Sequence, residues 1–327
     1  MSDWWNRAYL GSCESMAEIP DASVHCAVTS PPYFKHRDYG CEEQIGQELT
    51  MADYIARMVT VFREVRRVLR DDGTAWVNIG DSYAGSWGNQ SRKDERGTQR
   101  PITTGMIQSV HDGRYANATN TGVIRDPGLK PKDLMMVPHR LAIALQDDGW
   151  WVRDAIVWAK QGGMPSSVTD RCTSSYEMIF MLAKSENYYC DMNAVKQPLA
   201  TTSKGRYKQP KCIAGTQAGS TRANGGAKTN GPMRAIPVDA ANLRNVWAFS
   251  VASFSGNHPA VYPVELPSLC IQIGCPDGGI VLDPFMGSGT TAQAAEALGR
   301  RWVGYEVNPA YHALIAERTR QTGLFSA

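Results

Sequence analysis

The chain has 327 residues, of which 43% are hydrophobic and 20% are charged; this fits one large α/β domain with insertions, or a domain plus a smaller module. The formal net charge of +2 does not indicate a nucleic-acid partner, so such a partner must be argued from local clusters of charge. The first residues do not show the pattern of a signal peptide, which is a basic region followed by an apolar stretch. No apolar run in the sequence is long enough to span a bilayer. We therefore expect a soluble, cytoplasmic protein.

The eight cysteines predict a reduced protein without a metal site. None forms a Cys-x-x-Cys pair, and no histidine lies at zinc-finger spacing from one, so zinc is not expected. Cys26 and Cys270 lie in apolar runs and are typical of buried core residues.

The first third of the chain alternates strand and helix patterns. An apolar run at residues 24–28 predicts a buried strand, which leads into the polar segment Thr29-Ser30-Pro31-Pro32-Tyr33. Apolar residues then recur at helical spacing from 55 to 69. We expect Gly73 to end this helix and residues 74–79 to form the next strand.

The middle of the chain contains two irregular stretches. Periodicity disappears from about residue 84 to 131, a length that is rare unless the segment is functional or disordered. A helix at 134–146, broken or kinked near Pro138, and a strand at 151–159 follow. We expect a hairpin with arms at 176–182 and 188–190.

The second irregular stretch, residues 196–244, is strongly basic. It holds nine Lys or Arg residues and a single acid, Asp239. Such clusters bind nucleic-acid phosphates without regard to sequence, although a basic disordered linker would have the same composition. The predicted DNA contacts are Lys204, Arg206, Lys208 and Lys211.

The last segment predicts a helix at 266–273, a strand at 279–282, a helix at 292–298, a strand at 302–305 and a helix at 309–320. The overall fold class is a doubly wound, mostly parallel α/β sheet of the Rossmann-like kind. Ligands of such sheets bind beyond the carboxyl ends of adjacent strands where the winding reverses. If the strands at 24–28 and 279–282 are neighbours, their two following loops face each other across one crevice.

The loop Asp283-Pro284-Phe285-Met286-Gly287-Ser288-Gly289-Thr290-Thr291 has the pattern of a ligand-binding turn. Its glycines permit close backbone approach, and the helix behind them presents free amide groups. A phosphate-binding P-loop would need a lysine where Thr290 stands, so a zwitterionic methionine moiety fits better than a triphosphate. Glu306 ends the next strand, where an acidic side chain can accept hydrogen bonds from ribose hydroxyls.

The loop Ser30-Pro31-Pro32-Tyr33 suits the methylation of an exocyclic amine. The lone pair of such an amine is delocalised into its ring; hydrogen bonds accepted from its two hydrogens make it tetrahedral and free the lone pair. The two prolines fix the loop and remove competing amide donors, and Tyr33 offers a face on which an extruded base can stack. Taken in isolation, the segment is better explained as a polar turn after a buried strand, with Tyr33 as a core aromatic residue; the cofactor-type loop opposite it favours the catalytic interpretation.

The two loops together resemble the beta class of DNA amino-methyltransferases, which use S-adenosylmethionine. Weaker matches at residues 69–73, 176–184 and 258–260 extend the resemblance over nearly the whole chain except the two irregular stretches. It implies catalysis by Ser30, Pro31, Pro32 and Tyr33. It also implies a cofactor site made of Asp283, Pro284, Phe285, Gly287, Ser288, Gly289, Thr290, Thr291, Glu306, Asn308 and His258.

Within this family a serine at the first loop position favours N4 of cytosine, so the expected activity is site-specific methylation of cytosine N4 by base flipping and direct attack. The alternatives are adenine N6 within the same chemistry, and a non-catalytic DNA-binding module or an RNA or protein methyltransferase outside it. Methylation at C5 of cytosine needs a thiolate after a proline, and no Pro-Cys dipeptide occurs. The expected partners are double-stranded DNA, a cognate restriction endonuclease in the same restriction-modification system and a second copy in a homodimer.

The resulting domain division has three parts. Residues 1–195 form the catalytic half of the methyltransferase domain, with the irregular insertion at about 84–131. Residues 196–244 form the target-recognition segment, and residues 245–327 form the cofactor-binding half.

Overall fold

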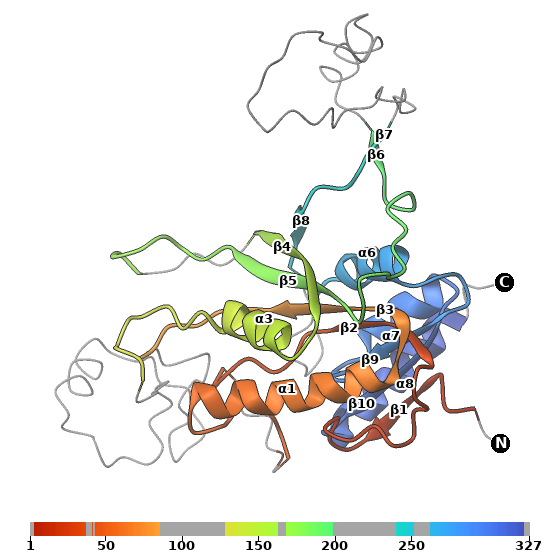
Figure 1. The fold of residues 1–327 in the computed structure, drawn as a ribbon, viewed down its shortest axis with the longest axis horizontal. Coiled ribbons are helices and arrows are strands. Elements are labelled where there is room, and N and C mark those ends of the chain that lie inside the picture. The colour runs from red at the N-terminus through yellow and green to blue at the C-terminus, as the bar shows by residue number, and fades with distance from the viewer. Residues whose placement is uncertain are drawn as a thin grey trace, which may run out of the picture. The chain divides into compact units, whose positions relative to one another are not determined.

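A mixed β-sheet organises the part of the chain that the structure describes, which comprises residues 3–36, 41, 43–85, 128–162, 168–198, 240–251 and 262–323 of a computed structural model. The sheet order is β1-β10-β9-β2-β3-β5-β4-β8 (Figure 1). The strands are β1 (Arg7–Leu10), β2 (Val24–Thr29), β3 (Leu69–Ile79), β4 (Trp151–Gln161), β5 (Tyr176–Ala183), β8 (Val246–Ser250), β9 (Ile280–Asp283) and β10 (Arg301–Glu306).

The five strands from β1 to β3 are parallel, and the remainder of the sheet is mixed. β1 pairs with β10, β10 with β9, β9 with β2 and β2 with β3, all in parallel. β5 is antiparallel to both β3 and β4, while β8 runs parallel to β4. This arrangement confirms the predicted α/β fold class with a mostly parallel, doubly wound sheet.

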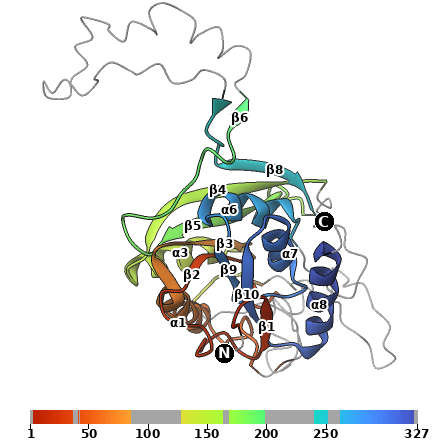
Figure 2. The ribbon, with the colours of Figure 1, turned by 90° about the vertical axis from the view of Figure 1, so that its right-hand side faces the viewer.

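Helices cover both faces of the sheet (Figure 2). α1 and α3 lie together on one face, whereas α6, α7 and α8 pack on the other. Their bounds are α1 (Met51–Val68), α3 (Val137–Asp147), α6 (Glu265–Gly274), α7 (Thr290–Ala297) and α8 (Pro309–Gly323).

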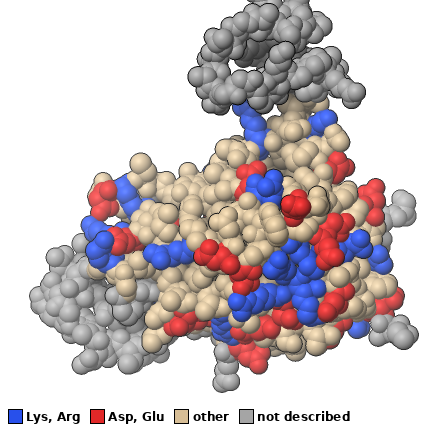
Figure 3. Space-filling model, viewed as in Figure 1, with Lys and Arg blue, Asp and Glu red and all other residues tan. Residues whose placement is uncertain are grey.

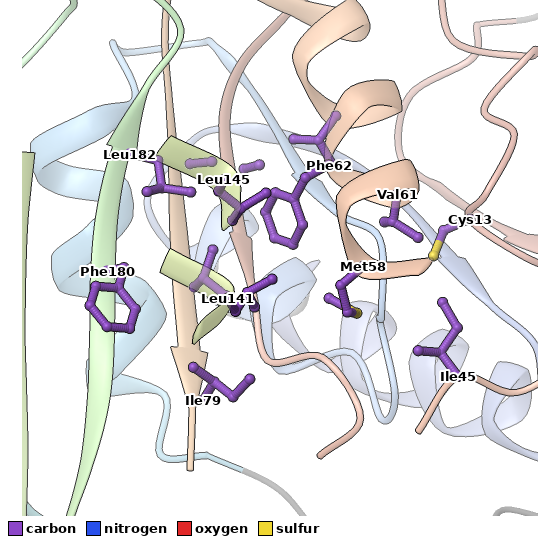
Figure 4. Packing of buried hydrophobic residues seen from close by; sticks show 14 of the residues in the cluster. Cys13, Ile45, Met58, Val61, Phe62, Ile79, Leu141, Leu145, Phe180 and Leu182 are labelled. Atoms are coloured by element: carbon purple, nitrogen blue, oxygen red, sulfur yellow. The ribbon is translucent and has the colours of Figure 1, made fainter. Parts of the chain in front are cut away.

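The main hydrophobic core lies between the sheet and the pair α1 and α3. Figure 4 shows Phe62 of α1 and Leu145 of α3 beside Leu182 of β5. These side chains are at most 1% exposed, and burying each contributes on the order of 2 kcal/mol. The amino end of α1 is fixed by Thr50, whose hydroxyl accepts a hydrogen bond from the Asp53 amide at 3.1 Å.

Charges of both signs interleave on the face shown in Figure 3. Two arginines of α1 are held in ion pairs: Arg57 with Glu14, and Arg63 with Asp148. Acidic partners therefore interrupt the basic surface along this helix.

The helix predicted to end at Gly73 ends five residues earlier. α1 stops at Val68, and β3 begins at once with Leu69. The pairing of β2 with β3 then jumps from Val24↔Leu69 to Cys26↔Thr74, so residues 70–73 form a bulge within the strand. The turn residues Asp72 and Gly73 therefore mark a bulge and not a helix end.

Two further expectations were wrong. Pro138 does not kink a helix, because α3 begins at Val137 and the proline occupies its first turn, where no amide donor is needed. The partner of β5 in the hairpin is β4 and not residues 188–190. β5 is buried along most of its length, so its backbone N–H and C=O groups need hydrogen-bond partners within the protein. β3 and β4 provide these partners, one on each side.

The chain divides into two units. One comprises Met1–Cys190 together with Asn245–Ala327 and contains the large sheet; the other is Asp191–Arg244. In the second unit, β6 (Gln197–Pro198) pairs antiparallel with β7 (Ala240–Ala241). Residues 199–239, which include Lys204, Arg206, Lys208 and Lys211, lie outside the described residues.

Candidate active site

The two loops singled out in the sequence follow neighbouring strands. β2 and β9 pair through Cys26↔Val281 and Ala27↔Leu282, so the Ser-Pro-Pro-Tyr loop (residues 30–33) and the glycine-rich turn (residues 287–289) leave the same edge of the sheet. From β2 the chain winds outward to β3, and from β9 it winds to β10 in the other direction. The loops therefore flank the point where the winding reverses, which is the usual ligand site of such sheets.

A buried carboxylate joins these loops at their base. Asp283, the last residue of β9, is 1% exposed, and its Oδ1 accepts a hydrogen bond from the Thr29 hydroxyl at 2.6 Å. The Phe285 amide donates to the same oxygen at 3.0 Å. The hydroxyls of Thr291 and Tyr262 donate to Oδ2. Burial raises the pKa of the Asp283 carboxyl, although these hydrogen bonds act in the opposite direction.

The glycine-rich turn adopts the left-handed backbone that its glycines allow. Gly287 and Gly289 have φ values of +53° and +86°, and a Cβ on Gly289 would stand 3.2 Å from Cα of Ile315 in α8. Helix α7 begins directly afterwards at Thr290. The turn can thus present backbone amides to a ligand at the amino end of a helix, with α8 closing it from behind.

Glu306 lies beside this turn at the end of β10. Its Oε2 accepts a hydrogen bond from the Gly287 amide and its Oε1 from the Asn308 amide, both at 2.8 Å. The residue is 8% exposed, and burial raises the pKa of its carboxyl to about 7 despite these hydrogen bonds. The Asn308 side chain accepts from the Ala310 amide at 3.0 Å and so caps α8.

The structure brings most of the remaining sequence-predicted cofactor residues into the same region. Pro284 and Ser288 are buried within the loop, and Phe285 packs against the hydrophobic core. Thr290 accepts a hydrogen bond from Arg318 of α8 at 2.6 Å. No local sequence pattern predicts this contact. His258 lies outside the described residues.

The Ser-Pro-Pro-Tyr loop is held from the α1 side. The Tyr54 hydroxyl donates to the Pro32 carbonyl at 2.9 Å, and Tyr54 is completely buried. The His36 amide donates to the Tyr33 carbonyl at 3.1 Å, which closes a turn. Pro31 is buried, while Ser30 and Tyr33 are partly exposed. The loop is thus anchored through its backbone and leaves two polar side chains, those of Ser30 and Tyr33, partly exposed.

Tyr33 bonds to Glu177, which in turn binds Asn78 and Lys160; the sequence reasoning assigned no role to these three residues. The Tyr33 hydroxyl donates to Oε2 of Glu177 at 2.6 Å, and the Asn78 side chain donates to the same oxygen at 3.0 Å. Lys160 forms an ion pair with Oε1. The signal that could have found them is their position at the ends of predicted strands, but their mutual contact depends on the order β3-β5-β4.

Within the described ranges, no group of three or more histidine, cysteine, aspartate or glutamate side chains is placed to hold a metal ion. Among the same residues, no helix is both long and apolar enough to cross a membrane.

Comparison with known proteins gives consistent matches along the chain. A family model described as DNA methylase (N6_N4_Mtase) matches residues 24–317. The Type II methyltransferase M.XycI of Xanthomonas campestris pv. cyanopsidis is 40% identical over 303 residues, which cover 93% of this chain and 83% of that protein.

The fold is shared with solved structures of other proteins. The PvuII DNA methyltransferase (cytosine-N4-specific) superposes with a TM-score of 0.60 at 18% identity, covering 95% of this chain and 85% of that one. TTHA0409 of Thermus thermophilus, solved in complex with S-adenosyl-L-methionine, gives 0.55 at 20% identity, covering 97% and 93%.

We expect the Thr29–Asp283 hydrogen bond to contribute measurably to the free energy of unfolding. Thr29→Val keeps the shape of the side chain but leaves a buried carboxylate one donor short, so we expect a loss of about 2 kcal/mol in the free energy of unfolding. Thr60→Val, the same exchange at an exposed position of α1, should change it by less than about 0.5 kcal/mol. Urea denaturation of both variants measures the difference; equal small losses would contradict a structural role for this bond.

Proposed function

Because the chain belongs to the N6/N4 family of DNA methylases, which transfer a methyl group from S-adenosylmethionine to DNA, we propose that its target is the N4 amine of cytosine within a specific site. The observation that carries the proposal is the position of Ser30 directly after β2, beside the cofactor loop that follows β9. The cytosine-N4 specificity in the name of the PvuII enzyme, which shares the fold, supports the same base.

The residues near the glycine-rich turn fit S-adenosylmethionine. Gly287 and Gly289 allow close approach to the backbone, and no lysine follows them to select a polyphosphate. Glu306 presents a buried carboxylate at the position from which a ribose could be held. When bound, this cofactor supplies an electrophilic methyl group on a sulfonium centre.

On the catalytic side, Ser30 and the carbonyl of Pro31 accept hydrogen bonds from the two hydrogens of the target amine. These bonds favour the tetrahedral nitrogen of the transition state and so act on turnover more than on binding. The neighbouring Pro32 carbonyl is already engaged by Tyr54, which fixes the loop backbone in place. Tyr33 stacks on the extruded base, and this contact offsets part of the few kcal/mol that extrusion costs.

We further propose that the basic stretch at residues 196–244 contacts DNA and contributes to target recognition, and that residues 1–195 and 245–327 supply the catalytic and cofactor halves. We likewise propose a cognate restriction endonuclease as a partner and a homodimer as the oligomeric state. The Type II names of the relatives support the first of these.

Ser30→Ala is expected to lower kcat by about tenfold to a hundredfold while leaving the affinities for DNA and cofactor nearly unchanged. Ser268→Ala, which removes a hydroxyl at the surface of α6, is the control and should keep full activity. Mass spectrometry of digested product DNA should show N4-methylcytosine. Product containing only N6-methyladenine would overturn the base assignment but not the chemistry.

Cofactor affinity should depend on pH through Glu306. With a pKa of about 7, the carboxyl is about nine-tenths ionised at pH 8 and about one-tenth at pH 6. Ribose hydroxyls donate to the ionised form, so affinity should fall by about tenfold between pH 8 and pH 6.

Glu306→Gln should bind more weakly at pH 8 and lose this part of the pH dependence. Calorimetry of both proteins over the same range measures it, and the titration of the cofactor itself is common to both. Identical pH profiles would rule out a role for the Glu306 charge.

Replacing Lys204, Arg206, Lys208 and Lys211 with alanine should weaken DNA binding and flatten its salt dependence. Each lost phosphate contact reduces the slope of log affinity against log salt by about 0.9, so the full set gives up to about 3.6. The control is Arg63→Ala with Arg70→Ala, two exposed arginines that have acidic partners. An unchanged slope in the fourfold variant would move the DNA surface elsewhere.

A further inference from the structure

Glu177 is bonded to donors from the catalytic loop and from the two strands that flank β5. It is the second residue of β5, and its register partner is Trp158 of β4. One carboxylate oxygen accepts from Tyr33 of the catalytic loop and from Asn78 of β3, and the other pairs with Lys160 of β4. Both oxygens of this carboxylate are therefore engaged by donors.

This environment fixes the direction of the Tyr33 hydrogen bond. A carboxylate can only accept, so the tyrosine hydroxyl must donate, and its 2.6 Å bond is charge-assisted. The Glu177 side chain is only 13% exposed, which strengthens the interaction relative to one in water. Lys160 neutralises the charge, so the carboxylate adds no net repulsion toward a nucleic-acid phosphate.

The ring of Tyr33 is also confined at its edge. A Cβ on Gly80, the residue after β3, would stand 2.7 Å from Cε2 of Tyr33 and 3.3 Å from Oε1 of Glu177. Only glycine leaves room for the ring at this point. With Tyr54 holding the loop at the Pro32 carbonyl, the ring is restrained at its hydroxyl, its edge and its backbone.

We infer that Glu177 is a positioning residue that holds the Tyr33 ring, through its hydroxyl, in the orientation in which it stacks on the extruded base. The inference rests on the proposed function, because it assigns Tyr33 the stacking role. A ring restrained before DNA arrives loses less conformational freedom when the base enters. The loop thereby depends on a glutamate that lies far from it in the sequence.

A double-mutant cycle tests this coupling. Tyr33→Phe keeps the ring and removes only the hydroxyl. Glu177→Gln leaves a single acceptor oxygen, which we expect to bond to Lys160. The amide NH₂ group then faces Tyr33, and the tyrosine hydroxyl loses its acceptor. We expect each single variant to lower kcat/KM for unmethylated plasmid DNA by about tenfold, the equivalent of losing one charge-assisted hydrogen bond. The double variant should be no more than about twofold worse than Tyr33→Phe, because Glu177 acts through the hydroxyl.

The matched control is Glu18→Gln. Glu18 accepts from the hydroxyl of Tyr305 at 2.7 Å, so this variant weakens a tyrosine–glutamate bond of similar length on β10, and activity should stay within about twofold of the wild type. Cofactor affinity and melting temperature are measured for every variant. Unaltered values in Glu177→Gln separate positioning from a general loss of folding.

If the wild type is active and the two single losses of kcat/KM multiply in the double variant, the role of Glu177 is overturned and the proposed function stands. A Glu177→Gln protein that melts lower in proportion to its loss of activity would also overturn it. If Glu177→Gln does not fold, Tyr33→Phe decides alone, and an unchanged kcat/KM in that variant overturns the inference. A wild-type protein that methylates no DNA would overturn both proposals.

Discussion

The hydrogen bond between Thr29 and Asp283 holds together two segments that are far apart in the sequence and adjacent in the sheet. β2 and β9 share only two register pairs, so backbone pairing alone anchors their carboxyl ends weakly. The buried carboxylate adds donors from β2, from the segment before α6 and from α7. Because an unpaired charge at this depth would be costly, these donors must stay together, and the two loops are fixed relative to each other.

Around this junction the two halves of the site are built differently. On the cofactor side the acidic groups are bonded to backbone amides: Glu306 to Gly287 and Asn308, Asp283 to Phe285. On the catalytic side the side chains of Tyr33, Asn78, Lys160 and Glu177 bond to one another across three strands and a loop. These amide bonds of the first arrangement all lie within the one segment that runs from β9 through α7 to just beyond β10. The second depends on the sheet order and fixes one aromatic ring.

The strands and loops of the parallel half could be predicted because their signals are local. The apolar runs before Thr29 and Asp283, and the glycines after Asp283, specify strand and turn without reference to distant residues. The predicted end of α1 was wrong because Asp72-Gly73 is compatible with both a helix stop and a bulge, and only pairing with β2 selects the bulge. The contact of Tyr33 with Glu177 spans 144 residues, and no spacing in the sequence encodes it.

The position of β1 has a consequence for how the protein is made. Within the described part of the chain, β1 lies at the edge of the sheet and pairs with β10 alone, and β9 separates that pair from β2. Of the strands that the structure describes, β1 is synthesised first and its partner β10 last, so β1 has no partner in the sheet until all the others have been made. β9 must enter between β10 and β2 at the same late stage. Closure of the sheet, and with it assembly of the two loops into one site, is consequently a late folding event that depends on contacts of long sequence separation, which form slowly.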